Sequence, residues 1–361
     1  MRNNWIDSLK GIAILGIVLV HSRLNGSYGY FSSFTVSGAR GVQLMFLING
    51  YLIFASLDRA DENQMKLRDW YIGKFKRLVP MYWFFTFIHL AVFGLGERFY
   101  LGPLEKVSVL NILCNLFFLH GFNPYYIGSI NANWYMADLA IWYLIAPFIF
   151  KFLKSFKKML TALFVFIPLD YVVLIILDKV PLIESEPIWH DYINVLCFPA
   201  EFPIILLGGA LYLGIRNVGR TEIISGRKKL ACAGTFFSLV CLMLLMIGSD
   251  RMFVFTNEFS YGIAFAILFA AQSIYSFPVF NNRFFALLGK YSYGIYLSHI
   301  IVIELIYRIY AFLQMPDITF FGWLFTYCLA LTVSLGISVL MEQCGNIIRK
   351  AGCTVKRRHT F

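Results

Sequence analysis

The first apolar segment, "IDSLKGIAILGIVLVHSRL" (residues 6–24), contains the ionisable side chains of Asp7, Lys10 and His21. An α-helix turns about 100° and rises about 1.5 Å per residue. Lys10 and His21, eleven residues apart, therefore lie within roughly 20° of one helix face and about 16 Å apart along the axis. Asp7 precedes Lys10 by one turn on the same face. We expect this polar stripe to face a bundle interior or a water-filled cavity, because charges exposed to lipid are costly.

Each residue of the stripe also has a purely structural interpretation. Asp7 could favour the start of the helix through the helix dipole. Lys10 could anchor the span at the interface, and His21 could be a hydrogen-bonded histidine at the far membrane edge. The alignment of His21 with the other two favours a functional role for this residue. Periodicity alone does not say which function.

The composition indicates an all-α polytopic membrane protein. Of 361 residues, 59% are hydrophobic, 18% are aromatic and only 14% are charged, a balance typical of many membrane spans. About ten transmembrane helices around a polar central cavity are expected. The predicted spans are 9–24, 39–57, 78–96, 133–150, 159–178, 192–215, 230–248, 258–277, 286–311 and 319–345.

The distribution of charge predicts the topology. If the short apolar stretch 108–122 is a partial or re-entrant segment, 24 of the 31 Lys and Arg residues fall on one side of the membrane and seven on the other. This split follows the positive-inside rule and puts both termini in the cytoplasm. The net charge of +11 is thus a topology signal and not a sign of nucleic-acid binding. We expect one membrane domain, 1–350, and a basic tail, 351–361.

The seven cysteines predict neither a metal site nor a disulfide framework. None stands in a C-x-x-C arrangement, and most lie in apolar segments, where a thiol behaves as a small hydrophobic group. The first span lacks a small-residue cleavage site, so we expect it to be retained. The protein is predicted to be a multi-pass protein of the plasma (inner) membrane.

Five stretches resemble, in order, the motifs of the integral-membrane acyltransferase-3 family. In "DSLKGIAILGIVLVHS" the match includes Asp7 and His21, with Lys10 where the family more often has arginine. In "NWYMADLAIWYLIAP", Asp138 follows Trp134 by four residues, where the family's acid often follows by five. The other matching stretches are "GVQLMFLINGYLI" (41–53), "FKRLVPMYW" (75–83) and "LGKYSYGIYLSHI" (288–300).

The resemblance implies a membrane O-acetyltransferase. Members of the family resemble one another across ten spans and usually acetylate sugars of bacterial surface polymers, such as O-antigen or exopolysaccharide. The donor would be cytoplasmic acetyl-CoA, with no metal. The acceptor would be a hydroxyl of a cell-surface polysaccharide or of its lipid-linked precursor.

In such a reaction His21 would be the general base that deprotonates the acceptor hydroxyl, or else a transient acyl carrier. Lys10 could polarise the thioester carbonyl or hold an anionic part of the donor. Asp7 could fix Lys10 in place. Asp138 is a second acid, which could orient the histidine or the acceptor.

Further residues could bind the two substrates. The basic residues Lys74, Lys76 and Arg77 could contact the phosphates of coenzyme A, or simply anchor the span. Residues that could lie on the acceptor side or line the cavity are His120, Trp134, Ser292, Tyr296 and His299. For these five, an interfacial aromatic belt or packing between spans is the structural alternative.

Two other functions remain open at the sequence level. Intramembrane Lys10 and His21 would also suit a proton-coupled transporter or flippase. The chain could also be an acyltransferase that uses another donor, such as succinyl-CoA.

Overall fold

A computed structural model of the chain describes most of its residues. The described residues are 4–22, 30–98, 105–127, 130, 133–180, 188–189, 192–217, 227–247, 257–315 and 319–358. Contacts within the chain separate it into two compact units. The first unit combines Met1–Ala39 with Arg283–Phe361, and the second is Arg40–Asn282.

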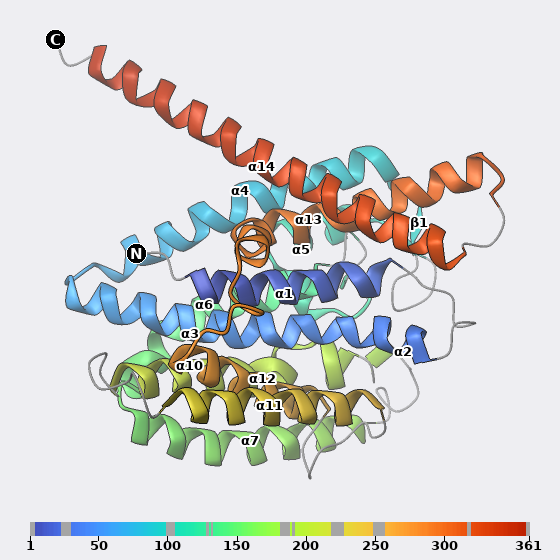
Figure 1. Cartoon of the computed structure of the whole chain (residues 1–361). Coiled ribbons are helices and arrows are strands. Elements are labelled where there is room, and N and C mark those ends of the chain that lie inside the picture. The colour runs from blue at the N-terminus through green and yellow to red at the C-terminus, as the bar shows by residue number, and fades with distance from the viewer. Residues whose placement is uncertain are drawn as a thin grey trace. The chain divides into compact units, whose positions relative to one another are not determined.

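The first unit is built from helices of both ends of the chain (Figure 1). Its helices are α1 (Asn4–His21), α2 (Tyr30–Ser37), α13 (Arg283–Phe312) and α14 (Phe320–Arg358). α13 packs against both α1 and α14. Because α14 continues to Arg358, it includes most of the segment that we expected to be a basic tail.

The second unit is also helical among its described residues. Its long helices are α3 (Gly41–Glu62), α4 (Leu67–Phe93), α6 (Trp134–Phe152), α7 (Phe156–Asp178), α10 (Phe198–Asn217), α11 (Arg227–Ile247) and α12 (Asn257–Ile274). The shorter elements are β1 (Glu97–Arg98), β2 (Glu105–Lys106), α5 (Val109–Leu116), η3 (Leu119–Phe122) and the π-helical turn η4 (Tyr192–Leu196). The short helix η2 (Gly38–Arg40) includes the point in the chain where the first unit ends and the second begins. α10 packs against α3, α7 and α12, and is therefore the centre of this unit.

The helices confirm the all-α polytopic membrane fold. Among the described residues, eight helices are long and apolar enough to cross a membrane. They are Asn4–His21, Phe34–Glu62, Trp134–Phe152, Phe156–Leu177, Phe198–Arg216, Lys228–Ile247, Arg283–Phe312 and Phe320–Asn346. Each overlaps a predicted span.

The two remaining predicted spans, 78–96 and 258–277, also lie largely in helices. The first overlaps α4. This helix begins at Leu67, so it also includes charged residues that precede the predicted span. The second overlaps α12, whose apolar part, Glu258–Ile274, is shorter than any of the eight. The ambiguous stretch 108–122 forms the eight-residue helix α5 and the turn η3. A helix of eight residues is too short to cross the hydrocarbon core, which requires about 20.

The backbones of α1 and α13 touch at two glycines. A β-carbon added at Gly11 would lie 2.0 Å from the carbonyl oxygen of Phe285, and one added at Gly289 would lie 1.6 Å from the carbonyl oxygen of Asp7. No side chain larger than hydrogen fits at either position unless a helix moves. Small residues at helix crossings are common in membranes, where association depends on close packing. This contact fixes how α1 lies along α13.

The same arrangement joins α3 to α10 in the second unit. A β-carbon added at Gly50 would lie 2.1 Å from the carbonyl oxygen of Ile205, and one added at Gly208 would lie 2.1 Å from that of Leu47. Each unit is therefore organised around one close helix pair.

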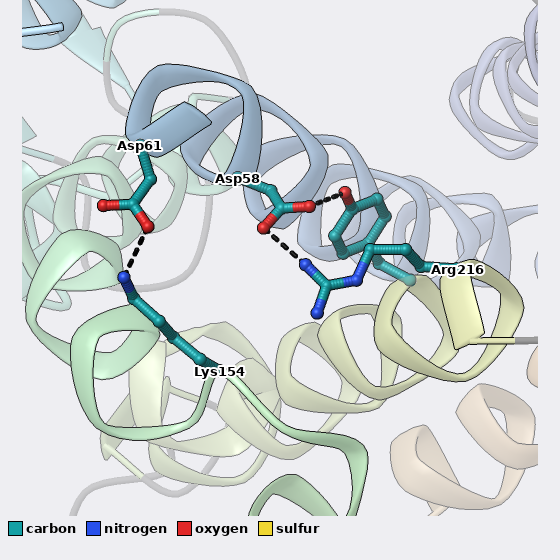
Figure 2. Close-up of polar contacts among 5 residues, drawn as sticks. Asp58, Asp61, Lys154 and Arg216 are labelled. Atoms are coloured by element: carbon teal, nitrogen blue, oxygen red, sulfur yellow. Dashed lines mark hydrogen bonds and ion pairs between the residues drawn. The ribbon is translucent and has the colours of Figure 1, made fainter. Parts of the chain in front are cut away.

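Ion pairs hold the ends of helices together in the second unit (Figure 2). Nη1 of Arg216 on α10 lies 2.5 Å from Oδ1 of Asp58 on α3, and the hydroxyl of Tyr212 donates to the other oxygen of Asp58. Near the end of α3, Asp61 pairs with Lys154, which follows α6, at 2.5 Å between Oδ2 and Nζ. Asp58 is buried, whereas Asp61 and Lys154 are exposed. Exposed ion pairs contribute little to stability, so the Asp58 cluster is the stronger link.

The glycine contact between α1 and α13 predicts the effect of a single methyl group. Gly289→Ala should lower the free energy of unfolding by about 1–3 kcal/mol or more, because the methyl overlaps backbone. The matched control is Gly336→Ala in α14, where no atom lies within 4 Å of the added carbon. The control should be neutral or slightly stabilising, because alanine favours helix. Thermal unfolding in detergent measures both, and equal midpoints for the two variants would contradict the contact.

Candidate active site

The polar stripe of α1 begins with an ion pair. Nζ of Lys10 lies 4.0 Å from Oδ1 of Asp7, one helical turn earlier. Asp7 is buried and Lys10 is half-buried, so the ammonium group is held close to the helix. The pair gives Asp7 the geometry expected of a residue that fixes Lys10.

His21 lies at the other end of the stripe, as the last residue of α1. The following residue, Ser22, is fixed by two aromatic side chains of the same unit. Nε1 of Trp323 donates to Oγ of Ser22 at 2.8 Å, and the hydroxyl of Tyr307 donates to the carbonyl oxygen of Ser22 at 2.6 Å. The end of α1 is thus attached to α13 and α14. Ser22, Tyr307 and Trp323 belong to no local motif, so the sequence does not single them out.

His299 of α13 lies beside His21. The centroids of the two imidazole rings are 5.2 Å apart, with an angle of 55° between the ring planes. His299 is fully buried, whereas His21 is half-buried. The structure therefore brings together two histidines that are far apart in the sequence.

The other polar residues of this face of α13 are buried too. The ring of Tyr296 lies 5.7 Å from that of His299. The hydroxyl of Ser292 donates to the carbonyl oxygen of Gly289 at 3.0 Å. Ser292 therefore bonds within its own helix, and Tyr296 is the nearer of the two to the histidine pair.

Asp138 belongs to the second unit, where it lies on α6. It is fully buried, and neither carboxylate oxygen has a hydrogen-bond partner among the described residues. Glu201 of α10, also fully buried, is close enough for the two charges to repel each other. Nε2 of Gln43 donates to Oε1 of Glu201 at 2.6 Å. An acid in an apolar span usually has a function, and by this signal the sequence could have indicated Glu201.

Two more charged residues lie near these acids. Nη1 of Arg40 is 2.7 Å from Oε1 of Glu258, at the start of α12. Arg40 also attracts Glu201, whereas Glu258 repels it. This cluster of charge lies in the interior of the second unit.

The three basic residues of α4 that we expected to contact coenzyme A have different surroundings. Nζ of Lys74 lies 5.0 Å from the ring centroid of Trp70 and 5.7 Å from that of Tyr143, within reach of cation–π attraction. Lys76 and Arg77 are exposed. Lys74 is therefore held against aromatic rings, whereas Lys76 and Arg77 remain accessible.

His120 and Trp134, both expected on the acceptor side, are buried in the second unit. Nε2 of His120 lies 3.3 Å from the carbonyl oxygen of Asn133, and its ring is stacked 6.4 Å from that of Tyr82. Burial lowers the pKa of His120 from 6.5 to about 4, although backbone hydrogen bonds act in the opposite direction. Trp134 packs against Phe46, with ring centroids 5.9 Å apart.

Comparison with known proteins identifies the family. A family model described as "Acyltransferase domain" matches residues 3–342. The chain belongs to the acyltransferase-3 family. The eight apolar helices among its described residues make this acyltransferase-3 protein a polytopic membrane protein. The family implies an acyl donor and an acceptor.

Individual relatives match a shorter part of this acyltransferase-3 protein. Proteins of Staphylococcus aureus strains COL, MSSA476 and MRSA252, each named "Putative O-acetyltransferase", are 36% identical to it over 77 residues. The matched stretch covers 21% of this chain and only 11% of each relative's length. No solved structure matches the chain. No group of three or more His, Cys, Asp or Glu side chains among the described residues is arranged to hold a metal ion.

The buried His120 predicts acid sensitivity of the fold. The pKa of His120 is about 4 in the folded protein and 6.5 in the unfolded chain. Between pH 4 and pH 6.5 the unfolded state therefore binds more protons than the folded state. As a result, the free energy of unfolding decreases as the pH falls from 6.5 to 4. The loss should reach about 3 kcal/mol. His120→Gln, which keeps a side-chain N–H, should lose less stability than the wild type between pH 6.5 and pH 4 in thermal unfolding. Equal losses in both proteins would contradict this assignment.

Proposed function

We propose that this acyltransferase is an O-acetyltransferase of the plasma (inner) membrane. It moves an acetyl group from cytoplasmic acetyl-CoA to a hydroxyl of a cell-surface polysaccharide or of its lipid-linked precursor. The observation that carries the proposal is the position of His21, a half-buried imidazole at the end of the polar stripe of α1. The family supplies acyl transfer, and the names of the Staphylococcus aureus relatives support acetyl as the group.

His21 is the general base of the proposed reaction. The oxygen of the acceptor hydroxyl attacks the carbonyl carbon of the thioester while His21 takes its proton. The C–O bond forms, the C–S bond breaks, and the thiolate of coenzyme A leaves. The thiolate then receives the proton from the imidazolium, so His21 ends the cycle neutral.

Helix geometry restricts the role of Lys10. The attacked carbonyl must lie beside a hydroxyl that is within hydrogen-bond reach of His21. Lys10 is about 16 Å from His21 along α1, too far to polarise the same carbonyl. Of the two roles expected for Lys10, binding of an anionic part of the donor is therefore the one we propose. Asp7 holds it in position.

The second unit, taken by itself, contains further residues that we propose for substrate binding. Lys76 and Arg77, exposed on α4, bind phosphates of coenzyme A through charge-assisted hydrogen bonds. Lys74, which lies over the ring of Trp70, adds a positive charge that attracts the same phosphates. Asp138, a buried acid without a described hydrogen-bond partner, orients the acceptor.

The base assignment is tested by His21→Ala. The variant should insert and fold, but transfer of labelled acetyl from acetyl-CoA to a carbohydrate acceptor should fall at least a hundredfold, because a general base contributes about 10²–10⁴ to the rate. Gly336→Ala serves as a folded control that keeps activity. Competition with unlabelled succinyl-CoA tests the choice of acyl group. Retained transfer in His21→Ala would exclude His21 as the base.

The donor contact is tested by Arg77→Ala. Loss of a phosphate contact should raise the KM for acetyl-CoA several-fold and leave kcat nearly unchanged, because the contact binds ground state and transition state alike. Lys157→Ala, which removes an exposed charge from α7, is the matched control and should leave the KM unchanged. An equal KM in the two variants would refute the phosphate contact.

A further inference from the structure

The ring of His299 lies beside that of His21. The ring centroids are 5.2 Å apart. At this separation, a rotation of the half-buried His21 ring is enough to bring one of its nitrogens within hydrogen-bond range of the His299 ring. Both residues belong to the first unit, in which α1 and α13 are in backbone contact.

The backbone of α13 determines the tautomer of His299. Nδ1 of His299 lies 2.6 Å from the carbonyl oxygen of Tyr296 and 3.2 Å from that of Ile295. A carbonyl oxygen can only accept, so Nδ1 carries the hydrogen. In the neutral ring, Nε2 then has the lone pair and is an acceptor.

Nε2 of His299 is a buried acceptor. It has no hydrogen-bond partner among the described residues. Leaving such a group unsatisfied costs about 1–3 kcal/mol. Because Nδ1 is occupied by the backbone, Nε2 is the nitrogen of His299 that is left to receive a hydrogen from a neighbour.

We propose that the ring of His21 turns toward His299 and donates an N–H to its Nε2, which makes His299 the positioning residue of the base. The inference rests on the proposed function, in which His21 is that base. The bond fixes which nitrogen of His21 carries hydrogen, so the other nitrogen presents its lone pair to the acceptor hydroxyl. It also stabilises the imidazolium that forms when His21 takes the proton. No proton passes to His299.

Other titratable side chains also lie near the pair. On α13 they are Tyr296, whose ring is 5.7 Å from His299, and Tyr307, whose hydroxyl is bonded to Ser22. On α14, Tyr327 donates to the carbonyl oxygen of Leu15 at 3.4 Å. The charged residues of α1 and α13 lie further along the chain: Asp7 and Lys10 at least three turns before His21, Arg283 and Lys290 more than two turns before His299, and Glu304 and Arg308 beyond it. On α14, Glu342 pairs with Lys290.

If His299 had only a structural role, its important contact would be the bond from Nδ1 to the backbone of α13. Two variants distinguish this structural role from the positioning role. Asn places an N–H where Nδ1 stood, so His299→Asn keeps the bond to the backbone but removes Nε2. Gln reaches the position of Nε2 and offers an oxygen acceptor there, so His299→Gln restores the acceptor and gives up the backbone bond. A positioning role requires the Gln variant to be more active than the Asn variant. A structural role requires the reverse order.

The experiment measures acetyl transfer by the full-length protein across pH. His299→Asn should lower kcat/KM roughly ten- to a hundredfold, as removal of an orienting partner does. It should also move the acidic limb of the kcat/KM profile to lower pH, because the imidazolium of His21 has lost an acceptor. His299→Gln should recover part of the rate and the original limb. Wild-type values for His299→Asn, or a higher rate for Asn than for Gln, would overturn the proposal.

A second measurement does not depend on activity, so failure of the positioning role can be distinguished from failure of the proposed function. In ¹⁵N-histidine NMR spectra, the wild type should show His21 as a single tautomer and His299 with hydrogen on Nδ1. His21→Ala and His299→Asn assign the signals. In His299→Asn, the His21 signal should become a mixture of tautomers. An unchanged His21 signal would overturn the proposal even if acetyl transfer is observed, whereas a protein without transfer would refute only the proposed function.

Discussion

The contact between the backbones of α1 and α13 determines the arrangement of the candidate active site in the first unit. Gly11 and Gly289 allow an approach that a single methyl group would prevent. At one end of this contact lie Asp7 and its partner Lys10. At the other end, the same alignment brings the ring of His21 to that of His299. A shift of either helix would separate the ring of His21 from that of His299.

Polar groups inside this apolar protein differ in how well they are satisfied. Arg40 pairs with Glu258, and Gln43 bonds Glu201, so part of the cost of burying these groups is recovered. Asp138 and Nε2 of His299 have no such partner among the described residues. Buried polar groups that remain unsatisfied reduce stability, so neither of these two groups strengthens the scaffold.

Most of the fold, but only part of the candidate active site, can be predicted from the sequence. Apolar length predicts the spans, and helical periodicity puts Asp7 and Lys10 on one face, because both signals are local. The proximity of His21 and His299 depends on a crossing between distant segments, and periodicity carries no information about it. The glycine at position 289 was visible inside a family motif, but only the structure shows that it lies against Asp7. Glu201 could have been found, because an acid within "FPAEFPIILL" is already unusual.

Several basic residues on the side predicted to be cytoplasmic act at two stages in the life of the chain. Arg216, Lys154 and Lys290 are each bound to an acid in the folded protein, at Asp58, Asp61 and Glu342. During insertion of the nascent chain the basic side chains act through their positive charge, because acidic residues contribute little to orientation. The basic side chains can therefore first retain their loops on the side of synthesis and afterwards cross-link the assembled helices. Biogenesis and tertiary structure thus use the same charges in succession.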